Sequence, residues 1–473
     1  MLTQTARQVR PWPALVVASL AAFMVFLDTQ VLFVAFDDIR ASFPTVSVSA
    51  MSWTLSAYTI ALAAALVPAG RMADRFGRRR TFMIGLAIFT GASLLCALAP
   101  TPAALVAFRV LQALGAAALI PSALALVLTV FPPERVPVAV AIWGSIAALS
   151  AAIGPTVGAL LVQQWDWRAA FLANLPVGIV ALALAPRLLP ESREHTRRRF
   201  PDPVGVVLLA GSLTLVALGI VQSQEWDWWS VRTVGAIVLG LILLGAFVRR
   251  TSTSEAPAID LRLFADRSFR WANVATAVFT IGFTAMFFVS IQFTTQVWGY
   301  SIVRAGLSMI PGPVVVVVLA PRMGQLASRF GQRALLVPGG LVYAAGGVWL
   351  LARMTTQPHY AADMLPAWLL AGLGVSLVMP QLISAAVQHL PADERAVGSG
   401  INQAVRQFGA TFGVALTVAL LGTFGSGDAL DHFQHVWWLL VLSGVISTAA
   451  ALRLPRPVPE VPAEVPEAVE LAA

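Results

Sequence analysis

Residues 70–80 read Gly-Arg-Met-Ala-Asp-Arg-Phe-Gly-Arg-Arg-Arg and form a basic segment between two long apolar runs. Residues 324–333 read Gly-Gln-Leu-Ala-Ser-Arg-Phe-Gly-Gln-Arg, so most of the pattern recurs 254 positions later. A second set of matches has an offset of 259 and pairs Leu114, Gly115, Pro121, Pro132 and Gly154 with Leu373, Gly374, Pro380, Pro391 and Gly413. The chain is therefore predicted to consist of two repeated halves that enter the membrane from the same side, a plan found in secondary transporters.

The composition between these motifs is that of a membrane protein. Of the 473 residues, 58% are hydrophobic and 11% are charged, and the mean hydropathy is +0.79. Soluble domains carry about 25% charged residues. A membrane-spanning helix needs about 20 mostly apolar residues, so the apolar content suffices for fourteen such helices and leaves no room for a sizeable soluble domain.

Fourteen apolar runs are predicted to be transmembrane helices of an all-α membrane protein. The first run contains Asp28 and is too long for a cleaved signal peptide. The predicted spans are 13–36, 50–69, 81–99, 103–128, 138–162, 169–186, 204–222, 233–248, 271–297, 305–321, 335–352, 365–389, 397–422 and 436–452.

Four segments follow from the repeat. Residues 1–190 are expected to form a six-helix bundle, 191–265 a linker with inserted helices seven and eight, and 266–452 a second six-helix bundle. Residues 453–473 are Pro-rich and acidic and are expected to form a disordered cytoplasmic tail.

The arginines fix an orientation for these spans. With both termini in the cytoplasm, 24 of the 31 arginines fall on the cytoplasmic side, five fall in outer loops, and Arg109 and Arg406 lie within spans. This asymmetry agrees with the positive-inside rule. It also explains the net charge of +8 without nucleic-acid binding.

All of the basic residues other than histidine are Arg, which excludes a P-loop ATPase and Schiff-base lysine chemistry. The single cysteine, Cys96, excludes an internal disulfide and is expected to be a small packed residue. We find no nucleophile–base arrangement and no metal-ligand spacing. The sequence therefore predicts neither an enzyme nor a metal or cofactor site.

Asp28 is the only acidic residue placed well inside a span. Burial disfavours the charged form of a carboxylate, so such a group can exchange protons near neutral pH, and a nearby cation such as Arg109 would oppose that effect. A cationic substrate and a proton could compete for this one charge. Asp37 and Asp38, by contrast, are expected to be solvated loop charges at the outer surface.

With these motifs, the chain resembles the major facilitator superfamily over about residues 15–450, and more closely its fourteen-helix drug:proton antiporter family of bacteria. The resemblance implies that the loop of Gly70, Asp74, Arg75, Gly77 and Arg78 is a conformational latch. Ser328 replaces Asp74 in the second copy, so the charged latch is expected on one side only. The alternative is a loop that serves only membrane topology.

The resemblance also assigns roles inside the helices. Arg109, followed by Gln112, is implied to act with Asp28 in proton coupling; the alternative is an arginine solvated near the membrane edge. The pattern Gly154-Pro155-x-x-Gly158 is implied to mark antiporters rather than symporters, although Ala159 replaces the usual next glycine.

A wide amphipathic substrate cavity between the halves is predicted near the membrane midplane. Any one of the residues predicted to line this cavity could instead pack between helices. The predicted lining residues are Gln30, Tyr58, Gln112, Asn273, Gln292, Tyr343, Gln381 and Arg406.

The sequence thus predicts a monomeric, proton-coupled antiporter of the bacterial plasma membrane that exports lipophilic, cationic or natural-product molecules by alternating access. Its expected partners are the substrate, protons and the lipid bilayer, with no nucleic acid. Two alternatives remain at this point: a proton-coupled metabolite symporter, and a non-transporting membrane sensor or assembly factor on a transporter-like scaffold.

Overall fold

The computed structural model describes residues 11–455 except 133–134, 193–201, 255–256, 258, 392–393 and 422–428. The tail predicted from residue 453 onward therefore lies almost entirely outside the described residues. In the described part, thirteen helical stretches are long and apolar enough to cross a membrane. The helix Val136–Gln164 covers the predicted run 138–162, which is the remaining one of the fourteen.

Each predicted span corresponds to one helix or to a pair of consecutive helices. The first nine helices are α1 (Pro11–Ser42), α2 (Val48–Phe76), α3 (Arg78–Ala97), α4 (Pro102–Val130), α5 (Val136–Gln164), α6 (Arg168–Leu172), α7 (Asn174–Leu188), α8 (Pro203–Trp226) and α9 (Val231–Thr253). The 3-10 helix η2 (Leu261–Ala265) leads to α10 (Arg267–Gln296), α11 (Ile302–Ser308), α12 (Pro311–Phe330), α13 (Gln332–Arg353), α14 (Tyr360–Asp363), α15 (Leu365–Val387), α16 (Arg395–Leu421) and α17 (Ala429–Ala451).

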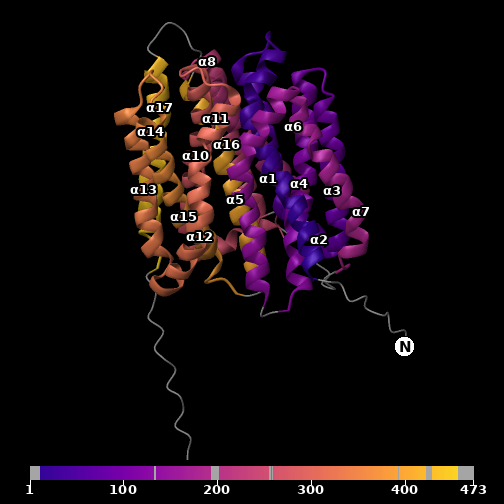
Figure 1. Ribbon diagram of the computed structural model, residues 1–473. Coiled ribbons are helices and arrows are strands. Elements are labelled where there is room, and N and C mark those ends of the chain that lie inside the picture. The colour runs from indigo at the N-terminus through magenta and orange to yellow at the C-terminus, as the bar shows by residue number, and fades with distance from the viewer. Residues whose placement is uncertain are drawn as a thin grey trace, which may run out of the picture.

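The helices stand side by side in two groups (Figure 1). Helices α1–α7 pack mainly on one another, and α10–α17 do the same. Between the groups, α2 packs along α16, and α5 packs against α11 and α12. The hydroxyl of Thr411 on α16 donates to that of Thr59 on α2 over 2.6 Å, so a polar contact joins the two groups.

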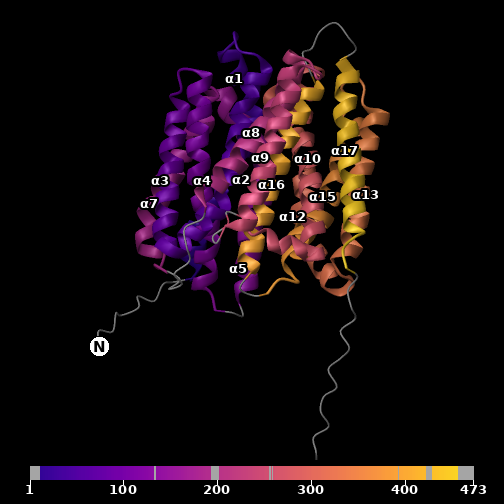
Figure 2. The same ribbon diagram turned by 180° about the vertical axis from the view of Figure 1, so that it is seen from behind.

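The inserted hairpin of α8 and α9 lies across the junction (Figure 2). Helix α8 contacts both α2 and α16, whereas α9 packs chiefly on α8. At the base of the hairpin, Asp202 accepts from Arg250 Nε over 2.8 Å and from Nη2 over 3.1 Å, and it also caps the first turn of α8. The hydrogen bond from Arg250 holds the pKa of the Asp202 carboxyl below its usual range.

The two repeated loops share one backbone feature. Gly77 has a φ of 109° and Gly331 a φ of 78°, a region that side chains disfavour. Each of these glycines separates two long helices, α2 from α3 and α12 from α13. The glycines at the end of each copy are therefore required by the sharp turn between those helices.

One difference between the observed and predicted boundaries changes the place of two acidic residues. Helix α1 continues to Ser42, so Asp37 and Asp38 lie on its last turns rather than in a solvated loop. Asp37 is half-buried, and Asp38 is also partly covered. The hydropathy pattern ended the run at the acidic pair, whereas the helix continues for about one turn beyond it.

Candidate functional site

The centre of the first helix group holds a buried ion pair. Asp28 Oδ2 lies 2.5 Å from Arg109 Nη1, and the two side chains are 2% and 1% exposed. Asp28 is the eighteenth residue of α1 and lies about 21 Å from its far end at the rise of an α-helix. Arg109 is therefore neutralised deep in the bundle and is not solvated near an edge.

Amide groups complete the surroundings of Asp28. Its Oδ1 accepts from Gln112 Nε2 on α4 and from Asn174 Nδ2 on α7, each over 2.9 Å. Gln112 and Asn174 also donate to Ser93 Oγ on α3, over 2.8 and 3.3 Å. Helices α1, α4 and α7 thus meet at one carboxylate, and α3 joins them through Ser93.

Arg109 is held by further groups. Its Nε donates to the carbonyl oxygen of Thr54 on α2 over 3.1 Å, and its Nη1 donates to Gln112 Oε1 over 2.6 Å. The guanidinium carbon lies 4.0 Å from the centre of the Tyr58 ring and 5.8 Å from that of Phe171. A cation over an aromatic face is stabilised by the ring quadrupole. This arrangement keeps the guanidinium aimed at Asp28.

Sequence reasoning named Asp28, Arg109, Gln112 and Tyr58 but missed Ser93 and Asn174 as members of this cluster. Asn174 is the first residue of α7. Its one local signal was an amide within an apolar run. Its partner Asp28 is 146 residues away, so no local spacing could have revealed the pair.

The glycines of α5 connect this cluster to the second helix group. A Cβ on Gly158 would lie 2.9 Å from Val31 Cγ1, and one on Gly154 would lie 2.6 Å from Gln30 Cβ. A Cβ on Gly306 of α11 would lie 2.8 Å from the carbonyl oxygen of Pro155. Helix α5 is therefore in close contact with α1 just beyond Asp28 and with α11 at the same level.

The predicted latch is described only in part. The side chain of Asp74 lies outside the described residues. A Cβ on Gly70 would make an ordinary contact with Pro121. Arg79 donates to the carbonyl oxygen of Leu189 over 3.2 Å and lies 3.8 Å from Glu191. The amide of Arg78 donates to the carbonyl oxygen of Ser192, so the loop is tied to the end of α7.

One contact from this loop reaches the segment that precedes the second half. Arg71 Nη1 donates to the carbonyl oxygen of Pro257. Sequence reasoning did not single out Arg71, because a loop with five arginines offers no way to choose among them. In the same loop, the Arg75 guanidinium carbon lies 5.8 Å from the centre of the Phe76 ring.

The structure does not gather the eight predicted cavity residues into one wall. Tyr58 and Gln112 belong to the Asp28 cluster, and Gln30 faces α5. Asn273 accepts from Asn402 over 3.0 Å within the second group. Tyr343 is buried between α10 and α15, with its ring centre 4.8 Å from that of Phe279, so it packs inside its own half rather than between the halves.

The other three residues lie apart from that cluster. Gln381 is buried, and its amide nitrogen has no hydrogen-bond partner in the described structure. Arg406 is half-buried on α16. The Gln292 amide lies 2.8 Å from Asp37 Oδ2 in the orientation that satisfies both groups, and near it Phe36 of α1 meets Phe288 of α10 with ring centres 5.2 Å apart. These contacts join the two halves near the ends of α1 and α10.

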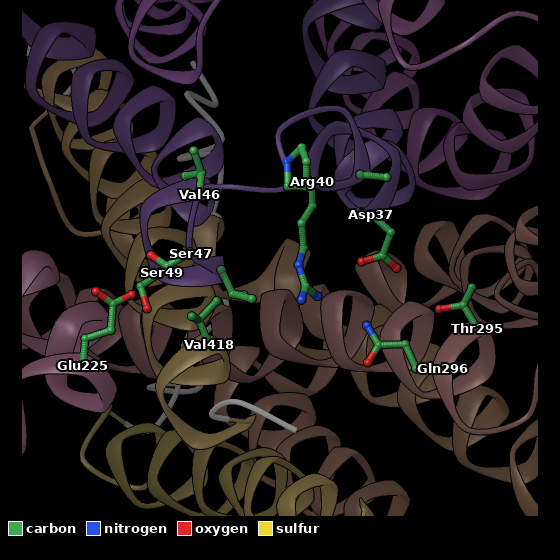
Figure 3. A pocket seen from close by; sticks show the side chains of 12 residues that line it. Asp37, Arg40, Val46, Ser47, Ser49, Glu225, Thr295, Gln296 and Val418 are labelled. Atoms are coloured by element: carbon green, nitrogen blue, oxygen red, sulfur yellow. The ribbon is translucent and has the colours of Figure 1, made fainter. Parts of the chain in front are cut away.

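A hollow of about 760 Å³ opens at the end of the bundle where α1 finishes and α2 begins. Figure 3 shows the Arg40 side chain reaching across it, with Asp37 and Gln296 on one side and Ser47, Ser49 and Glu225 on the other. Its lining comes from α1, α2, α8, α10 and α16 and therefore from both helix groups and the inserted hairpin. Sequence reasoning missed this hollow because its charged residues resemble ordinary loop charges.

The family model for the Major Facilitator Superfamily matches residues 18–414 and 312–472. The chain belongs to the Major Facilitator Superfamily. This confirms the resemblance inferred from the loop and helix motifs and identifies the chain as a multi-pass membrane transporter.

Relatives within the superfamily are named as export proteins. The tetracenomycin C resistance and export protein of Streptomyces glaucescens is 32% identical over 465 residues, 98% of this chain and 83% of that protein. The cephamycin export protein CmcT of Amycolatopsis lactamdurans is 33% identical and covers 93% of this chain and 91% of that protein. The multidrug efflux pump LfrA of Mycolicibacterium smegmatis is 32% identical, and the match covers 89% of this chain and 82% of that protein.

Solved structures show the same superfamily fold. A D-xylose-proton symporter has a TM-score of 0.69 at 16% identity and covers 94% of this chain and 98% of that one. At this identity the likeness establishes the fold alone. It does not decide the direction of transport.

Proposed function

We propose that this chain exports hydrophobic small molecules, drugs or natural products, from a bacterial cell in exchange for protons. The observation that carries the proposal is the buried Asp28–Arg109 pair, in which one carboxylate connects α1, α4 and α7. The names of the relatives support export, because they include both multidrug and single-antibiotic exporters. The molecule would act as a monomer in the plasma membrane with both termini in the cytoplasm.

Protonation of Asp28 would act through the charge of Arg109. Removing one partner of a buried ion pair costs about 3–5 kcal/mol, because the other charge remains buried without compensation. Arg109 must then rely on Gln112 and the carbonyl oxygen of Thr54, which are already its partners. The protonated cluster is therefore unstable in this arrangement and favours a different packing of α1 against α4.

That repacking would reach the second half through α5 and α10. Gly158 touches Val31, three residues beyond Asp28, and the carbonyl of Pro155 touches Gly306 of α11. Phe36 of α1 meets Phe288 of α10. A shift of α1 cannot leave these contacts unchanged, so proton binding can alter how the halves meet. We propose this as the coupling step of alternating access.

The hollow at the end of α1 would be the outer vestibule through which substrate leaves and protons enter. It touches both groups and α8, so its shape depends on how the halves are placed. The hollow is polar because the guanidinium of Arg40 and the carboxylates of Asp37 and Glu225 line it.

The test is compound tolerance and dye efflux in an efflux-deficient bacterium. The native protein is compared with Asp28→Asn and with Asp431→Asn, which removes an exposed acid at the start of α17. At matched membrane levels, native protein and Asp431→Asn should lower dye accumulation, and Asp28→Asn should not. If none of the three changes accumulation across a broad panel, the proposed export function is wrong.

A further inference from the structure

The two arginines within the predicted membrane spans, Arg109 and Arg406, have different surroundings. Arg109 is paired with Asp28, whose oxygens accept from Arg109, Gln112 and Asn174. With only 2% of its side chain exposed, this carboxylate is not accessible to an organic cation. Asp28 can therefore bind a proton without being the group that recognises the substrate.

Arg406 has no carboxylate partner in the described part of the chain. Its Nη1 donates to Gln403 Oε1 over 3.1 Å, one turn earlier on the same helix. Its Nε is buried and has no acceptor among the described residues. An arginine at membrane depth is costly and is retained for function by default. The negative charge that would balance Arg406 is therefore expected to come from a ligand.

The packing of α16 shows where Arg406 lies. Thr411 marks the side that faces α2, and Gly409 marks the side that faces α10, where its Cβ would lie 2.6 Å from the carbonyl oxygen of Ala277. At about 100° per residue, these two sides are nearly opposite. This leaves two other sides of α16, which lie to either side of the line from α2 to α10 and are called its flanks.

These two flanks differ in chemistry. One carries Val405, Phe408 and Phe412, and the other carries Ser399, Gln403, Arg406 and Ala410, all half-buried. The apolar helix α8 also packs on α16 and matches the apolar flank. With α8 on the apolar flank, the polar flank lies on the opposite side of the line between α2 and α10, away from the inserted hairpin.

We propose that Arg406 binds an acidic group of the transported molecule, a carboxylate or an ionised phenol or enol, in the space between the halves. A guanidinium binds a planar oxyanion through two parallel hydrogen bonds, and Arg406 has donors to spare. The substrate is then a hydrophobic acid rather than an organic cation. This inference rests on the proposed export function and specifies its substrate class.

The proposal separates the two charges of the transport cycle. The proton binds at Asp28 in the first half, and the substrate anion binds at Arg406 in the second. Outward movement of an anion and inward movement of a proton carry charge in the same electrical direction. An inside-negative membrane potential therefore drives both, and export of an acidic substrate should accelerate as that potential is raised.

The test uses inside-out membrane vesicles that contain the full chain, with an imposed pH gradient and two fluorescent probes. Fluorescein is the anionic probe and ethidium is the cationic probe. The variants are Arg406→Gln, Arg406→Lys and Arg406→Glu. The control is Arg304→Gln, which removes an arginine that stacks on Tyr300 at the start of α11. All are compared at equal amounts of protein in the membrane.

The native protein and Arg304→Gln should accumulate fluorescein in preference to ethidium. Arg406→Gln should lower fluorescein transport about tenfold, the effect of losing one charge-assisted interaction. Arg406→Lys should retain part of it, and Arg406→Glu should reverse the preference toward ethidium, which simple misfolding cannot do.

Two results would overturn the inference, and they can be distinguished. If the native protein moves ethidium but not fluorescein, or if Arg406→Gln leaves the ratio of the two unchanged, Arg406 does not recognise an acid and export itself stands. If the native protein moves neither probe, nor any compound of the efflux panel, the proposed export function fails, and this inference fails with it.

Discussion

At the scale of single residues, the account depends on how many donors hold Asp28 in its charged form. Three side chains donate to this carboxylate: Arg109, Gln112 and Asn174. Hydrogen bonds to the charged form of a carboxylate favour that form. Transport should therefore depend on each donor.

Asn174→Leu should lower efflux about tenfold. The change removes one of the three donors to Asp28 and leaves its Oδ1 with Gln112, and a hydrogen bond to a charged group contributes about 1.5–3 kcal/mol. Efflux of a dye is measured in cells with matched protein levels. Ser122→Ala is the control, because in the described structure that hydroxyl donates to the carbonyl oxygen of Ala118 on its own helix. Native efflux in Asn174→Leu would mean that this hydrogen bond is not needed for transport.

The sequence predicted part of this cluster. Asp28 and Arg109 could be found because a charge within an apolar run is conspicuous, and their proximity was anticipated. Ser93 and Asn174 could not be found in the same way, because uncharged polar residues are frequent in such helices and their partners come from other helices. Arg406 was visible as a charge, but its lack of a carboxylate partner appeared only in the structure.

At the scale of helices, α5 contacts α1 on one side and α11 on the other. Gly158→Val would place a branched side chain where Val31 already lies 2.9 Å from a Cβ. Overpacking of this kind costs about 1–3 kcal/mol and shifts the backbone. Efflux should fall at least tenfold while the protein still reaches the membrane. The control is Gly91→Ala, whose Cβ would meet nothing within 4 Å. Native efflux in Gly158→Val would contradict the role of this contact.

The hairpin of α8 and α9 gives a second prediction at this scale. Arg250 lowers the pKa of Asp202, so this carboxylate stabilises the folded protein above its ordinary pKa of 3.8 and loses that effect as the pH falls below it. The native melting temperature in detergent should therefore drop more steeply than that of Asp202→Asn between about pH 5 and pH 3. Parallel curves for the two proteins would show that the pair contributes nothing to stability.

The helices themselves were largely predictable. All fourteen apolar runs are helical in the described structure, because length and hydropathy suffice to identify a membrane span. Two of them are divided in two, at Ala173 and at Met309–Ile310. Prolines at 176 and 311 mark these places in the sequence. Hydropathy alone could not show these breaks, since the apolar runs continue across them.

At the scale of the whole molecule, the repeat in the sequence corresponds to a repeat in the fold. The loops at Gly77 and Gly331 turn with positive φ at the same position of each copy. The inserted hairpin packs on α2 and α16, one helix from each group. The sequence indicated the repeat and the insertion, but it could not show which helices the hairpin would touch, because apolar surfaces of this kind fit many partners.

The residues predicted to line a central cavity show the limit of sequence reasoning at this scale. They were chosen as polar or aromatic residues within spans. The structure separates most of them among the Asp28 cluster, the contact between α1 and α5, the contact between α1 and α10, and the interior of the second half, whereas Arg406 lies on the polar flank of α16. Tyr343 illustrates the reason, since an aromatic residue in a membrane helix can pack within its own half as readily as it can face a cavity.

The central claim, that export is coupled to protons at Asp28, is tested most directly by substrate-dependent proton movement in energised inside-out vesicles. A pH-sensitive dye is followed while an exported compound is added to vesicles with native protein or Asp28→Asn at equal amounts. We expect the compound to dissipate the pH gradient with native protein only, while Asp28→Asn still exchanges labelled for unlabelled compound. If Asp28→Asn moves protons as the native protein does, Asp28 is not the coupling group.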